Sequence, residues 1–229
     1  MHRIDLTPVY VLHTRPYSNT SLIIELFSKS HGRVSAVARS ARGPKSRYQG
    51  KLQLFTPILA SWFGNHELKT LSSIELDGMP HQLNQKSLFC GFYLNELLMR
   101  LLHKEDAHSA LFSLYQECLC RFEKNDKLAP TLRLFEKRLL AELGYGLPLV
   151  HEAGNRKPIQ PDNYYRFECQ QGFFKCDRSV SRCFLGADLL AIEAELFESD
   201  VVATEAKRLM REVILNLLGN KVLHSRALF

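Results

Sequence analysis

The sequence predicts an α+β protein, with strands in the first third of the chain and helices in most of the remainder. Between residues 8 and 77, short apolar segments alternate with turn signals at regular intervals, which is typical of a small barrel or sandwich. After the break DGMP at 77–80, apolar residues recur at helical spacing instead. The 229 residues are enough for one large domain or two modest ones with a buried core.

Five strands are expected in residues 1–79, which we take as the first domain. They are TPVYVLHTRP, TSLIIELFS, RVSAVARSAR, LQLFTPILASWF and HELKTLSSIEL. In the third, Val34, Ala36 and Ala38 fall on one face, as strand alternation requires. Five short strands in this length favour a five-stranded OB-fold barrel and leave an SH3-like barrel as the alternative.

Helices are expected in most of the second domain, residues 80–229. Three packed helices are predicted over 86–144, and two more at roughly 186–198 and 201–218. The intervening segment, about 145–184, is irregular and holds one hairpin, YYRFECQQGFFKCD. We interpret it as a small insertion in a mostly helical domain.

Positive charge is concentrated in the first domain. The net charge is +6, and residues 1–78 carry ten basic and five acidic side chains, a net +5. From residue 28 to 57 there are seven Lys or Arg and no Asp or Glu. Solubilising surfaces usually mix both signs, so this stretch indicates a polyanion partner, and cations along a barrel suit a single-stranded nucleic acid. The predicted binding residues are Arg33, Arg39, Arg42, Lys45, Arg47 and Lys51.

The aromatic residues near these cations have a simpler interpretation. Phe27, Phe55 and Trp62 stand in apolar strand context, so we expect them in the core. A membrane surface is the weaker alternative partner, because the basic stretch is not an amphipathic helix. No run approaches eighteen apolar residues, and the N-terminus has no signal-peptide pattern. We therefore expect a cytoplasmic protein with no membrane partner.

Metal binding is not expected. Cys169, Cys176 and Cys183 are spaced seven apart, whereas zinc sites bring cysteines in close pairs. His151 would bring the number of possible ligands to four, but the spacing of the four residues does not match a zinc site.

No catalytic constellation is recognisable either. His103 and His108 flank two carboxylates, an arrangement that a loop or helix start explains equally well. GNRKP lacks the P-loop pattern, and no G-x-S-x-G or H-E-x-x-H occurs. We predict a protein that is not an enzyme and has no cofactor.

A second basic feature lies on the predicted helix PTLRLFEKRLLAELGYG. Arg133 and Lys137 share a face, and Arg138 is adjacent. Leu134 is expected to be exposed beside them. A cationic face next to an apolar spot would receive an acidic peptide with a hydrophobic end, while an ordinary solvated helix face is the equal alternative.

These residues resemble the bacterial recombination mediator family RecO, of the gamma-proteobacterial type. The matching segments are VLHTRPYSNTSLIIELFSKSHGRVSAVARSARGPKS, LQLFTPI, YLNELLMRLL, LRLFEKRLLAELGYG and the ending LHSRALF, which is similar to the family's SREL(F) element. Their order and spacing are specific and extend over nearly the whole chain.

The resemblance implies a DNA repair and recombination protein with an OB-fold, a helical domain and an insertion that binds zinc in many members. Because the cysteine pairs are missing here, we expect no zinc. It also implies binding of single- and double-stranded DNA, annealing of complementary strands, and action with RecR to load RecA onto DNA coated by the single-stranded DNA-binding protein SSB, at the nucleoid.

The resemblance further implies that the helical domain holds the acidic, Phe-ended tail of SSB by a basic residue and an apolar pocket. Arg133 matches that basic residue, and Leu134 and Arg138 are carried over from the helix pattern. An RNA-binding OB-fold factor, which would prefer structured RNA, is the alternative function. A DNA-processing enzyme, which would need metal or ATP, is a further one.

Overall fold

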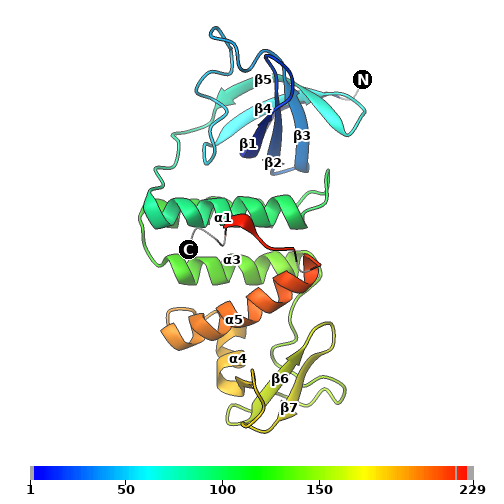
Figure 1. The fold of residues 1–229 in the computed structure, drawn as a ribbon, viewed down its shortest axis with the longest axis vertical. Helices are drawn as coiled ribbons and strands as arrows, with labels where there is room; N and C mark the ends of the chain where they lie inside the picture. The colour runs from blue at the N-terminus through cyan, green and yellow to red at the C-terminus, as the bar shows by residue number, and fades with distance from the viewer. Residues whose placement is uncertain (1–2, 220, 226–229) are drawn as a thin grey trace. The chain divides into compact units, whose positions relative to one another are not determined.

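The computed structural model describes residues 3–219 and 221–225 (Figure 1). The described residues up to Asp126, together with 223–225, form one compact unit, and Lys127–Val222 forms a second. The first contains β1 (Arg3–Pro16), β2 (Leu22–Ser28), β3 (Gly32–Ala38), β4 (Ile58–Phe63), β5 (Leu68–Leu76), α1 (Gln85–Leu101) and α2 (Ser109–Glu123). The second contains α3 (Leu128–Glu142), β6 (Tyr164–Glu168), β7 (Gly172–Cys176), β8 (Phe184–Leu185), α4 (Gly186–Glu193) and α5 (Asp200–Leu217).

The first five strands form a closed barrel in the order β1-β2-β3-β5-β4. The β3–β5 pair is parallel, and the other neighbouring pairs are antiparallel. β1 pairs with both β2 and β4, and its register shifts between Val11 and His13, as at a bulge that bends a strand around a barrel. The predicted α+β class with an N-terminal OB-fold barrel is confirmed. The division into domains at residue 79 stays a prediction.

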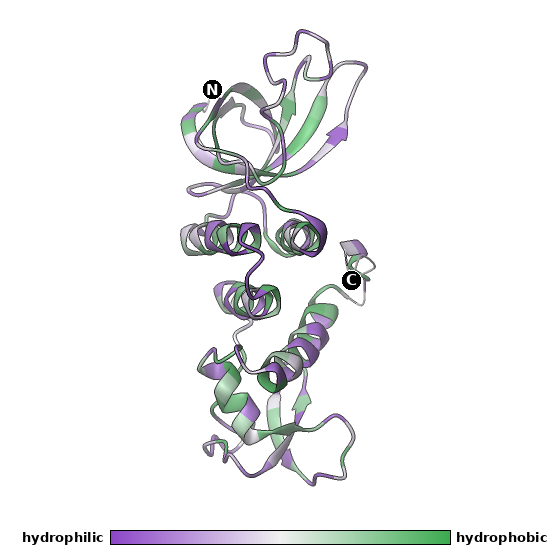
Figure 2. Cartoon of the chain, turned by 90° about the vertical axis from the view of Figure 1, so that its left-hand side faces the viewer, coloured by the Kyte–Doolittle hydropathy of each residue, from purple (hydrophilic) through white to green (hydrophobic). Residues whose placement is uncertain are grey.

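Alternating side chains fill the barrel interior. Val34, Ala36 and Ala38 point into it, as predicted, and Trp62 packs with them. Phe27 and Phe55 are also buried, so the prediction that these aromatics are core residues is confirmed. Figure 2 shows the result: hydrophobic residues follow the strands, and the loops that join them are mostly hydrophilic.

A second apolar layer joins the outer face of β1 to α1 and α2. The ring of Tyr10 lies 5.6 Å from Phe112 and 5.1 Å from Tyr115, measured between centroids. The Asn95 side chain donates a hydrogen bond to the Leu12 carbonyl at 3.0 Å and accepts one from the Tyr115 hydroxyl at 2.6 Å. Because these polar groups are buried and hydrogen-bonded, they fix the position of the helices against this side of the barrel.

Two segments that carry the family resemblance meet at Glu96 on α1. The carboxylate accepts hydrogen bonds from the His224 amide at 3.0 Å, the Ser225 amide at 2.8 Å and the Ser225 hydroxyl at 2.6 Å. Burial raises the pKa of Glu96, but these bonds, helped by Arg100, outweigh it and hold the pKa below its ordinary value. Residues 226–229 of the LHSRALF ending lie outside the described residues.

The second unit contains the predicted hairpin, β6–β7, within a three-stranded sheet of order β7-β6-β8. Tyr165, Phe173 and Phe184 are almost completely buried on one face of this sheet. Arg208 of α5 lies over Phe184, with its guanidinium carbon 3.7 Å from the ring centroid. α5 ends within one residue of its predicted end, whereas α4 ends at Glu193, short of the predicted residue 198. The left-handed φ of +58° at Gly219 follows the end of α5.

Gly32 in the β2–β3 turn is expected to be intolerant of a side chain. Its φ is +60°, and a Cβ would lie 1.7 Å from the Asp106 carbonyl oxygen. Gly50 has a similar φ of +72° but nothing within 4 Å of its would-be Cβ. We expect Gly50→Ala to lower the free energy of unfolding by about 1 kcal/mol through backbone strain, and Gly32→Ala by clearly more. Denaturant unfolding measures both, and equal losses would contradict this packing.

Glu96→Gln should destabilise the protein in a pH-dependent way. The folded-state pKa is below the unfolded one, so the carboxylate contributes stability above the unfolded pKa and loses it as pH falls through the folded pKa. At neutral pH we expect a loss of about 1–2 kcal/mol, since charged hydrogen bonds are replaced by neutral ones. The difference from the wild type should shrink in acid. A loss that is the same at pH 7 and below pH 4 would contradict the account.

Candidate nucleic-acid interface

The basic stretch forms an anchored loop between β3 and β4 (Figure 1). Tyr48, at its centre, is only 3% exposed and packs with the barrel core. Its hydroxyl donates a hydrogen bond to the Leu71 carbonyl at 3.2 Å. Leu52 and Leu54 pack against the same core. The loop therefore presents its polar side chains from a fixed backbone.

The cations of this loop point to solvent. Arg39, Arg42, Lys45 and Arg47 are exposed, and Lys51 is half-buried. Arg47 donates a hydrogen bond to the Tyr48 hydroxyl at 2.7 Å, and Lys51 lies 3.5 Å from the Ile74 carbonyl oxygen. We call these residues the loop cations: Arg39, Arg42, Lys45, Arg47 and Lys51.

Within the described part of the chain, no ion pair involves a loop cation. Elsewhere in the same unit, cations do have acidic partners. Lys69 lies 2.6 Å from Glu105, and Arg100 lies 3.2 Å from Glu96. The loop cations therefore keep a positive potential that attracts an external anion.

Arg33 differs from the other predicted binding residues. Its guanidinium lies 3.7 Å from Glu25, and both side chains are largely buried. Glu25 also accepts a hydrogen bond from the Ser35 hydroxyl at 2.8 Å. The expectation that these cations lack a local acid therefore fails at Arg33, because pairing of β2 with β3 brings an acid from the preceding strand beside it.

Tyr17 is a candidate that the sequence reasoning did not select. It lies in the turn between β1 and β2, and it is 56% exposed. Arg42 ties the basic loop to this turn, because its guanidinium donates to the Ser18 carbonyl at 3.2 Å and its amide to the Thr20 carbonyl at 2.9 Å. The signal was the position of Tyr17 directly after Pro16, outside the apolar strand pattern. An exposed ring beside unpaired cations is the arrangement that single-strand binding sites use to stack on a base.

The predicted tail-binding residues on α3 are placed differently from the expectation. Arg133 donates to Glu136 at 2.9 Å, and both side chains are buried. Leu134 is only 9% exposed, so the prediction that it is exposed was wrong. The reason is that six consecutive residues, 131–136, are buried, so that this part of α3 is covered on every side.

The exposed end of this helix face is already paired with acids. Arg138, whose side chain is 50% exposed, donates to both Glu195 oxygens, at 2.7 and 3.2 Å. Lys137 donates to the Glu193 carbonyl at 2.7 Å and lies 3.4 Å from the Glu193 carboxylate. The hydrogen bond from Arg138 is the main reason that the pKa of Glu195 lies below its ordinary value. Two acids at the C-terminal end of α4, Glu193 and Glu195, therefore neutralise this face.

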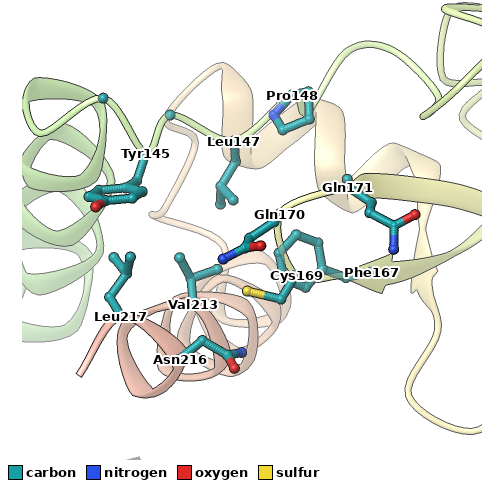
Figure 3. A pocket seen from close by; sticks show the side chains of 13 residues that line it. Tyr145, Leu147, Pro148, Phe167, Cys169, Gln170, Gln171, Val213, Asn216 and Leu217 are labelled. Carbon is teal, nitrogen blue, oxygen red and sulfur yellow. The ribbon is translucent and has the colours of Figure 1, made fainter. Parts of the chain in front are cut away.

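A cavity of about 600 Å³ lies between the loop after α3, the β6–β7 turn and α5 (Figure 3). Tyr145, Leu147, Phe167 and Val213 contribute apolar surface, and Asn216 contributes an amide. None of its lining residues is charged, so it is not arranged to hold a phosphate or a carboxylate.

Residues 3–219 and 221–225 contain no group of three or more His, Cys, Asp or Glu placed to hold a metal ion. Nor does any helix among them combine the length and apolar character needed to cross a membrane.

Comparison with known families gives matches over almost the whole chain. The model "Recombination protein O N terminal" matches residues 1–79, and "Recombination protein O C terminal" matches residues 84–227. The chain belongs to the RecO family. The boundary between the two matched regions falls at the break after the barrel.

Relatives in the RecO family are similar over nearly their full lengths. The DNA repair protein RecO of Coxiella burnetii (strain RSA 493 / Nine Mile phase I) is 51% identical over 227 residues, which cover 99% of this chain and 98% of the relative. DNA repair protein RecO of Actinobacillus succinogenes is 42% identical over 220 residues, covering 96% and 93%. That of Haemophilus influenzae (strain PittGG) is 42% identical over 225 residues, covering 98% and 95%.

Proposed function

We propose that the protein is a recombination mediator that binds single- and double-stranded DNA and anneals complementary strands without acting as an enzyme. Membership of the RecO family gives it a role in DNA repair and recombination. The finer proposal is carried by one observation: an OB-fold barrel holds five loop cations that have no ion pair within the described residues. Regularly spaced phosphates are the natural partner of such a set.

Annealing is limited by repulsion between two phosphate backbones. The loop cations neutralise phosphates and lower that repulsion when two strands are held near the same barrel. Tyr17 supplies a ring next to them that bases of either strand can stack on. No bond is made or broken, so the mechanism needs neither metal nor nucleotide.

We further propose that the protein works in the cytoplasm at the nucleoid, with RecR, to help load RecA onto SSB-coated single strands. Recruitment by the SSB tail would raise the local concentration of the barrel at its substrate. Arg133, Leu134 and Arg138 remain the proposed tail-binding residues. Arg138 is the exposed cation among them, so it would meet the tail directly, while the other two support the helix from within.

Glu193 and Glu195 give this proposal a regulatory aspect. They form ion pairs with Lys137 and Arg138 in the absence of a partner. Surface ion pairs of this kind are weak, so an acidic tail can displace them by exchanging one set of carboxylates for another. These two acids would then set how tightly the tail binds.

Reversing three loop cations tests the DNA-binding proposal. We expect Arg39→Glu, Arg42→Glu and Lys45→Glu together to abolish binding of a single-stranded oligonucleotide, measured by fluorescence anisotropy, and to leave binding of an SSB-tail peptide intact. For the wild type, roughly four to six phosphate contacts predict a log–log salt slope of about −3 to −4.

A matched control separates local from net charge. Lys86→Glu, Lys124→Glu and Lys207→Glu change exposed lysines outside the loop and likewise take the net charge from +6 to zero. This variant should keep most of its DNA affinity. Equal losses in both variants would mean that total charge, and not the loop, governs binding.

Glu195→Gln tests the tail site. Releasing Arg138 should raise the affinity for an SSB-tail peptide by up to about fivefold, the upper end of the range expected for an exposed ion pair. Arg138→Ala should lower that affinity, and in combination with Glu195→Gln it should cancel the gain. Isothermal titration calorimetry of the wild type, the two single variants and the double variant measures the coupling free energy between Arg138 and Glu195 in tail binding. If neither single substitution changes the affinity, Arg138 is not part of the tail site.

A further inference from the structure

The small sheet of the second unit has one buried and one open face. Directly opposed residues of antiparallel strands share a face, and Phe167 pairs with the buried Phe173. Arg166 pairs with Phe174 in the same ladder, so both project from the opposite face. Tyr164 lies two residues before Arg166 and shares that face.

Two partly exposed aromatic rings therefore flank an arginine on this open face. Tyr164 and Phe174 are each intermediate between buried and exposed, in contrast to the almost completely buried Phe173 of the inner face. Tyr164 is directly opposite Cys176, so Tyr164 and Phe174 are diagonal neighbours, and such positions on one face of a sheet are about 7–8 Å apart. This spacing allows rings on adjacent strands to contact neighbouring nucleobases.

Positive charge accompanies the rings. The guanidinium carbon of Arg178 lies 5.8 Å from the centroid of the Tyr164 ring. The side chain of Arg166 is 52% exposed and pairs with Glu168, and a partly exposed ion pair of this kind contributes little and exchanges readily. Arg182 is exposed on the loop that follows. We call the following residues the stacking face: Tyr164, Arg166, Phe174 and Arg178.

We propose that the stacking face is a second contact site for single-stranded DNA, in which Tyr164 and Phe174 stack on bases and Arg166 and Arg178 contact the flanking phosphates. The inference rests on the proposed DNA-binding function of the barrel. A single strand is the fitting occupant because its bases offer their π-faces, whereas bases in a duplex are already stacked on each other. The cations match the charge of its backbone.

Substitutions of the two rings test the proposal in the full-length protein. Tyr164→Ala with Phe174→Ala should weaken single-strand binding about tenfold, the scale of losing one or two stacked bases. The salt slope and duplex affinity should not change, because no phosphate contact is removed. Tyr164→Phe should bind normally, and Phe174→Leu should not, because leucine keeps the apolar volume but has no π-face. Tyr145→Ala, an exposed ring off this face, is the matched control and should have no effect.

Arg178 separates stacking from charge. Arg178→Gln should reduce the magnitude of the salt slope by about 0.7, the value for one lost phosphate contact on a single strand. An unchanged slope removes Arg178 from the site. An RNA oligonucleotide of the same sequence should compete less well than DNA; RNA that competes better would overturn the assignment to DNA.

Photocrosslinking of the unmodified protein gives an answer even where a variant fails to fold. An oligonucleotide carrying 5-iododeoxyuridine should crosslink to the peptide containing Tyr164 or Phe174, as well as to the barrel. Crosslinks confined to the barrel would overturn the stacking face and leave the proposed function standing. A wild-type protein that binds no single-stranded DNA would overturn both.

Discussion

Closure of the barrel is the constraint on which the distribution of charge depends. The interior is filled by mainly apolar side chains such as Val34 and Trp62, and the outer face of β1 packs against α1 and α2. The loop cations stand on the connection between β3 and β4, outside this packed interior. Tyr48 makes this arrangement stable, because its burial holds the loop against the repulsion of its own like charges. A rigid cationic loop loses little conformational entropy when it binds a polyanion.

The two proposed partner surfaces differ in whether their cations already form ion pairs in the unbound protein. The loop cations make no ion pair within the described residues, so their potential is available for a polymer of phosphates. On α3, Glu195 already occupies Arg138, and an incoming acidic peptide must replace an existing ion pair. The first arrangement favours affinity that falls steeply with salt. The second favours a contact that forms and exchanges readily, as recruitment requires.

Local patterns predicted most of the fold, and long-range pairing explains most of what they missed. Strand alternation placed Val34 and Ala36 inside the barrel, because one buried face is the simplest rule a strand can follow. The helical pattern predicted an exposed Leu134, because such a pattern assumes that one side of a helix faces solvent. Residues 131–136 of α3 are all buried instead. Glu195 is 57 residues from Arg138, so no sequence window could reveal their pairing. The loop cations were predictable because no acid lies near them in sequence, and their anchoring by Tyr48 was not.

Residue-level chemical footprinting can show directly whether the loop cations contact a single strand. Arginine- and lysine-directed reagents would be applied to the protein with and without a saturating single-stranded oligonucleotide, and modified sites quantified by mass spectrometry. We expect Arg39, Arg42 and Lys45 to become protected, while Arg100 and Arg121, which have acidic neighbours on their own helices, react as before. Unchanged reactivity of the loop with the oligonucleotide demonstrably bound would contradict this expectation.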